Sequence, residues 1–100
     1  MNAKVPQKKT EIDTSLLEQG IKNINHVKEL ITASQEDAKV MKDNCKNALT
    51  ENPLDIDMQS QLLSLNDYII KTTQNLYSLD SQLNELETQL EAGNRMKNVN

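Results

Sequence analysis

The feature that most constrains this chain is a repeat of apolar residues at every seventh position, interrupted once near residue 52. After the interruption, two nearly unbroken series alternate at steps of four and three residues: Met58, Leu65, Thr72, Leu79 and Leu86, and Leu62, Ile69, Leu76, Leu83 and Leu90. Before it, two weaker series are Leu17, Ile24, Ile31, Ala38 and Cys45, and Gly20, Val27, Ser34, Met41 and Ala48. Such paired series are typical of helices that pack along a narrow apolar seam, as in coiled coils.

The interruption is the sequence ALTENPLDID, residues 48–57. Proline disfavours helical geometry in the residue before it, so Asn52-Pro53 ends the first helix. Either Asp55 or Asp57 can cap the second helix. A short connection favours antiparallel neighbours. We therefore predict an all-α fold, an antiparallel two-helix coiled-coil hairpin over 13–92, with helices at about 13–50 and 55–92 and a turn at 50–55.

The two seams also predict a register. If the chain folds back near residue 51 or 52, as a short antiparallel connection would, two residues that share a layer have sequence positions whose sum is about 103. Ile24 then lies opposite Leu79, and Ala38 lies opposite Leu65. Two polar members of the seams, Ser34 and Thr72, fall in adjacent layers near the middle.

The two ends of the chain differ from its body. Residues 1–12 are polar and basic and contain Pro6, so we predict a disordered arm. Gly93 follows the last residue of the apolar repeat, where a helix C-cap is expected. We accordingly predict a second disordered segment at 93–100.

The apolar residues that remain outside the seams predict a protein partner. The second helix carries a further row with a spacing of seven: Ile56, Leu63, Ile70 and Tyr77. The first helix has spare apolar residues at Leu16, Ile21, Leu30 and Val40. A continuous apolar row normally meets another helix. The occupant is another helical chain or a second copy, or else the chain folds over into a three- or four-helix bundle, for which Gly20 is a weak candidate break.

Composition and charge narrow the class of function. The formal net charge is −4, whereas nucleic-acid binding needs clustered Lys and Arg, so we expect no nucleic-acid partner. Seven acids and a single base, Lys71, lie between Asp55 and Glu91, which allows an acidic chaperone or inhibitor of a basic partner. We expect no transmembrane segment and no cleaved signal peptide, hence a cytoplasmic chain or export without such a signal.

The sequence predicts no enzyme and no cofactor. His26 has no second His or Cys at ligand spacing, and we interpret the single cysteine, Cys45, as a small buried apolar residue of the seam. Acids two positions apart, such as Asp55 and Asp57, point away from each other on a helix. Two glycines cannot form a phosphate-binding glycine-rich loop. We predict neither catalytic nor metal-binding residues.

The segment NALTENPLDIDMQSQLLSLNDY, residues 47–68, resembles the turn region of the needle subunits of type III secretion systems. Those proteins are short helical hairpins whose turn often holds Asn-Pro before a leucine-rich helix with a Tyr. After Tyr68 the chain departs from that pattern and ends in polar GNRMKNVN. The leading hypothesis is a non-enzymatic interaction subunit with a structural, scaffold or chaperone-like role. The resemblance implies an alternative, a signal-less secreted hairpin subunit of a bacterial secretion system.

Overall fold

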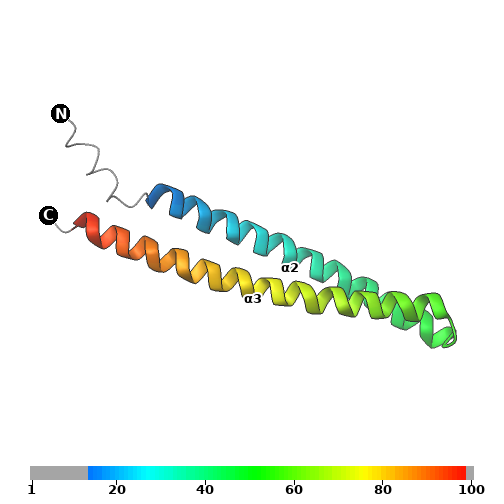
Figure 1. Cartoon of the computed structure of the whole chain (residues 1–100). Coiled ribbons are helices and arrows are strands. Elements are labelled where there is room, and N and C mark those ends of the chain that lie inside the picture. Colours follow the sequence, from blue (N-terminus) through cyan, green and yellow to red (C-terminus); the bar gives the residue numbers. More distant parts are fainter. Residues whose placement is uncertain (1–13, 99–100) are drawn as a thin grey trace.

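Two long helices joined by a tight turn make up the structure, a computed structural model that describes residues 14–98. Helix α2 spans Thr14–Glu51, helix α3 spans Ile56–Asn98, and they lie antiparallel side by side, with the C-terminal end of α3 running beyond the start of α2 (Figure 1). The all-α hairpin predicted from the sequence is confirmed. The predicted arm at 1–12 lies outside the described residues.

The turn is closed by hydrogen bonds of its own residues. The Asn52 amide donates to the Ala48 carbonyl (3.0 Å), and the Asp55 amide donates to the Asn52 carbonyl (3.2 Å). The Asp55 carboxylate accepts from the Met58 amide at 3.1 Å, which makes Asp55 the N-cap of α3. Of the two residues that the sequence offered as a cap, Asp55 is the one used.

The C-terminal end of the hairpin differs from the prediction. Helix α3 continues to Asn98, whereas the sequence predicted its end near residue 92 and a disordered segment from 93. Gly93 lies inside the helix, is buried, and does not have the positive φ of a helix-ending glycine. Gly93 and Thr14, at the start of α2, are both buried and their numbers add up to 107, as for Gln35 and Thr72, so we infer that the helices still pack together there and that this packing supports the helix beyond its intrinsic propensity.

The seam of α3 agrees with the prediction. In α2, only one of the two predicted series lies in the seam. Both predicted series of α3, from Met58 to Leu90, are buried or half-buried, as is the α2 series from Leu17 to Cys45. The second α2 series is wrong as an inward row, because Val27 and Met41 are 42% and 54% exposed. Its place is taken by a row one residue further on, all buried or half-buried: Thr14, Ile21, Lys28, Gln35, Lys42 and Leu49.

The register also differs from the prediction. Gln35 contacts Thr72, Cys45 contacts Gln61, and a Cβ at Gly20 would lie 3.2 Å from the Leu86 side chain, so the paired numbers add up to 106 or 107 and not to 103. The turn spans 52–55, so its centre lies about two residues after the fold-back point predicted near residue 51 or 52. Each α2 residue faces an α3 residue about one turn further on: Ile24 is opposite Leu83 and Ala38 is opposite Ile69.

A polar layer lies at the middle of the seam. The Gln35 side-chain amide donates to the Thr72 hydroxyl (2.7 Å) and is within hydrogen-bond distance of the Thr73 hydroxyl (3.0 Å) and the Ile69 carbonyl (3.3 Å). The Thr72 hydroxyl in turn donates to the Tyr68 carbonyl at 2.7 Å. Gln35 and Thr72 are buried, so these bonds are needed to offset the cost of removing both from water.

The register can be tested with two cysteine pairs in a Cys45→Ala background. Ile24→Cys with Leu83→Cys should form a disulfide on mild oxidation, because these residues share a layer and disulfides require Cα atoms within about 7 Å. Ile24→Cys with Leu79→Cys is the matched control and should stay reduced, since Leu79 lies one turn away. Mobility on non-reducing gels distinguishes them; preferential closure of the second pair would contradict this register.

The polar layer predicts that replacing one of its two partners lowers the free energy of unfolding more than replacing both. Gln35→Ala should lower the free energy of unfolding by about 1–3 kcal/mol, because it removes three contacts and opens a cavity. Gln35→Leu with Thr72→Val should leave that free energy unchanged or raise it by about 1 kcal/mol, because both polar partners are replaced by apolar ones. Urea titrations followed by circular dichroism measure both. Equal losses in the two variants would contradict the assignment.

Candidate interaction surfaces

The α3 strip, defined as Ile56, Leu63, Ile70 and Tyr77, lies on the outside of the hairpin. The four residues are 76%, 69%, 58% and 70% exposed. Residues seven apart lie on one face of a helix, so they form a continuous row. The flanking positions three and four residues on are all polar, and two of the eight are acids: Gln59, Ser60, Asn66, Asp67, Thr73, Gln74, Asp80 and Ser81. The strip is therefore a single row of large apolar side chains between two polar rows.

Cross-helix contacts fix the side of the hairpin on which the strip lies. Ile70 is three residues before Thr73, which contacts Gln35 of α2, and Tyr77 is three residues before Asp80, which pairs with Lys28 of α2. Residues three apart share a helix face. The strip consequently borders the side of the hairpin where Thr73 and Asp80 reach across to α2.

The spare apolar residues of α2 do not join the strip. Leu16, Leu30 and Val40 are exposed, whereas Ile21 is half-buried in the inward row. Leu30 is four residues before Ser34, whose hydroxyl is hydrogen-bonded to that of Tyr68, so it lies on the other side of the hairpin. Val40 lies between the seam residues Ala38 and Lys42, on the back of α2. The eight predicted partner-binding residues thus do not form one surface.

A second surface, the Tyr68 face, was not predicted from the sequence. Its α2 row is the series that the sequence placed inside the seam: Gly20, Val27, Ser34, Met41 and Ala48. Val27, Met41 and Tyr68 are exposed, and the three small residues of the row are half-buried. The spacing of seven carried the signal, but spacing alone does not say whether a row points inward or lies beside the seam.

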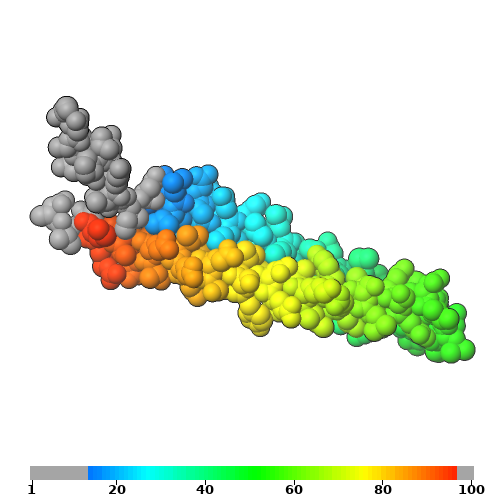
Figure 2. Space-filling model, in the orientation of Figure 1, coloured from blue at the N-terminus to red at the C-terminus, as the bar shows by residue number. Residues whose placement is uncertain are grey.

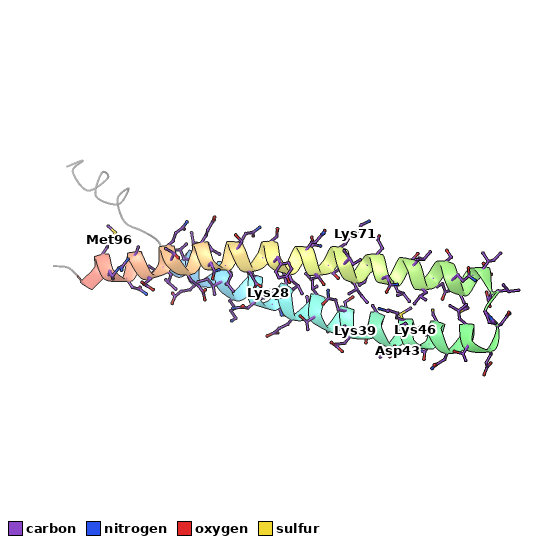
Figure 3. The ribbon with its side chains drawn as sticks, turned by 90° about the horizontal axis from the view of Figure 1, so that it is seen from below. Lys28, Lys39, Asp43, Lys46, Lys71 and Met96 are labelled. Atoms are coloured by element: carbon purple, nitrogen blue, oxygen red, sulfur yellow. The ribbon has the colours of Figure 1, made fainter. Side chains whose placement is uncertain are left out.

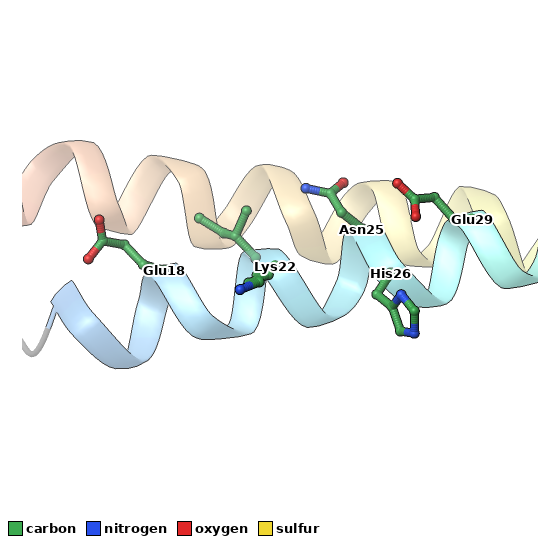
Figure 4. A pocket seen from close by; sticks show the side chains of 6 residues that line it. Glu18, Lys22, Asn25, His26 and Glu29 are labelled. Atoms are coloured by element: carbon green, nitrogen blue, oxygen red, sulfur yellow. The ribbon is translucent and has the colours of Figure 1, made fainter.

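The hollows of the surface are shallow. One is lined by α2 residues alone, among them Glu18, Lys22, Asn25, His26 and Glu29 (Figure 4). In that view the His26 ring projects away from α3. Small-molecule sites normally enclose most of the ligand surface between several elements. The space-filling view likewise shows a slender rod without a deep cleft on the face that it presents (Figure 2).

The charged side chains form exposed pairs. Lys71 pairs with Asp67 at 2.9 Å and Arg95 with Glu91 at 3.7 Å, each within α3. Lys71 projects outward from α3, and Lys39, Asp43 and Lys46 lie along the half of α2 that is nearer the turn (Figure 3). Exposed pairs of this kind contribute little to stability, about 0–1 kcal/mol each. Across residues 14–98 no three His, Cys, Asp or Glu side chains gather as metal ligands would, and neither helix there is apolar enough to cross a membrane.

Comparison of the chain with protein-family models, with curated proteins and with solved structures gives no match.

Proposed function

We propose that this protein is a non-enzymatic interaction subunit that docks a helix of a partner protein on the α3 strip. The exposure of all four strip residues supports this proposal. Four large apolar side chains in one row are costly to leave in water, at about 25 cal/mol per Å² of apolar surface. A partner helix that covers the row would remove that cost.

The shape of the strip indicates the kind of helix that fits. The row is one residue wide, and its polar borders keep water access on both sides. A partner helix with apolar residues at a matching spacing of seven, and with polar flanks, can lie along it as in helix-in-groove recognition. The acid beside the centre of the row, Asp67, is already paired with Lys71, so the borders carry little unbalanced charge.

Leu63→Asp with Ile70→Asp should abolish partner capture. The hairpin should keep its helicity, because both residues are exposed and lie outside the seam. The matched control is Ser64→Asp with Ser78→Asp, which puts two equal charges on exposed positions of α3 away from the strip. Affinity capture from the native cell, with proteins quantified by mass spectrometry for wild type, variant and control, measures the effect. Proteins captured equally by wild type and by the strip variant would count against the strip.

Salt concentration separates this proposal from an acidic chaperone of a basic partner. Binding through the apolar strip should persist at about 1 M salt, where exposed charges farther than about 3 Å apart are screened. Binding through the acidic residues of α3 should be lost under the same conditions. Washing the captured complexes at low and at high salt tests this difference directly.

Export without a cleaved signal, which the resemblance to needle subunits implies, stays a prediction. It requires the chain to reach the culture medium in a manner that depends on a secretion apparatus.

A further inference from the structure

The Tyr68 face differs from the α3 strip in its chemistry. Its α2 row, Gly20 to Ala48, lies beside an α3 row whose members are also spaced seven residues apart: Gln61, Tyr68, Asn75 and Gln82. The hydrogen bond between Ser34 and Tyr68 joins the two rows at their middle. Neither row contains a charged residue. The opposite side of the hairpin carries the cross-helix ion pair of Lys28 with Asp80.

The order of residue sizes in the α2 row is symmetric about Ser34. The row reads small, large, small, large, small, and its two large members, Val27 and Met41, lie seven residues to either side of Ser34. The α3 row is symmetric about Tyr68 in its inner members, with the amides Gln61 and Asn75 seven residues to either side, whereas the outer Gln82 has the turn residue Leu54 as its counterpart. A surface whose pattern reads the same in both directions can pack on its own copy about a two-fold axis.

From this symmetry we propose that the Tyr68 face binds the same face of a second copy of this chain. The two-fold axis crosses the hairpin beside Ser34 and Tyr68, so that α2 packs antiparallel on the partner's α2 and α3 on the partner's α3. Val27 then contacts Met41 of the partner subunit, and Gly20 lies against Ala48 of the partner subunit. The other two-fold arrangement, with α2 over α3, would place Val27 and Met41 on amides.

The absence of charged residues from the two rows makes the face compatible with a second copy as the occupant. Each chain has a formal net charge of −4, so two copies repel wherever acids face one another. Near a two-fold axis each residue meets its own equivalent, and a carboxylate or an ammonium there would meet a like charge. Carboxamides both donate and accept hydrogen bonds, so Gln61 can pair with Asn75 of the partner subunit. The two rows of the Tyr68 face meet this requirement with amides, hydroxyls and apolar side chains, and the charged residues Asp37 and Lys71, three residues after Ser34 and Tyr68, lie at its borders.

The available area suits a stable dimer. From Gly20 to Ala48 the row is about 42 Å long at 1.5 Å per residue, and two helices side by side are about 20 Å wide. This outline of about 840 Å² per chain is large enough to hold an interface in which each partner buries roughly 800 Å² of accessible surface, the standard size. The result is a four-helix bundle with both α3 strips left exposed.

Analytical ultracentrifugation of the full chain tests the proposal. Wild type should sediment as a species of twice 11.3 kDa at micromolar concentration. Val27→Glu with Met41→Glu should raise the dimer dissociation constant about 100-fold or more, because four carboxylates would be buried at the contact. Helicity should be retained, since both side chains are exposed in the single hairpin. Leu63→Asp with Ile70→Asp is the matched control and should leave the dimer intact.

Cross-linking gives a second readout that needs no charge in the interface. In a Cys45→Ala background, Ser34→Cys should form a disulfide-linked dimer on mild oxidation, whereas Ser81→Cys, on the exposed surface of α3, should not. A strictly monomeric wild type, a dimer that survives Val27→Glu with Met41→Glu, or a dimer broken by the strip variant alone would each overturn the proposal. The two proposals use different residues, so either can fail without the other.

Discussion

The buried contact between Gln35 and Thr72 sets the alignment on which the other features of the hairpin depend. Heptad seams made largely of Leu and Ile pack almost equally well when one helix slides by a turn, because each layer is replaced by a similar one. A buried amide does not allow this freedom, since every shift would leave it opposite an apolar side chain and without a hydrogen-bond partner. Thr72 and Thr73 provide that partner in one register.

The alignment decides which residues face outward. With Gln35 opposite Thr72, the inward row of α2 runs through Ile21 and Lys28, and Val27 and Met41 move to the flank. Two helices cannot cover more than one seam, and among the described residues the buried apolar side chains are Ala38 and Cys45. The hairpin therefore exposes apolar residues on two opposite sides, the α3 strip and the Tyr68 face. In the two proposals made above, one side binds a partner helix and the other binds a second copy.

Local chemistry explains which predictions succeeded. The Asn52-Pro53 step and Asp55 act within a few residues, so the turn and the cap of α3 were accessible from the sequence. The α3 seam was also accessible, because nine of its ten members are large and apolar. The α2 seam could not be predicted in the same way, because its second row contains Lys28, Gln35 and Lys42. The neighbouring row of Val27, Met41 and Ala48 is more hydrophobic. Long side chains such as Lys can line a seam with their methylene stems and keep the charge in water.

The sequence by itself determined the two helices, the presence of a turn at Pro53 and the existence of an apolar row at Ile56, Leu63, Ile70 and Tyr77. These follow from spacing, proline geometry and capping, all of which act along the chain. Only the tertiary structure decided the register, the inward row of α2 and the end of α3 at Asn98. Each of these depends on which residue of one helix meets which residue of the other. A two-residue change in the centre of the turn shifts every such pairing by a full helical turn, so it moves polar and apolar residues between the seam and the surface.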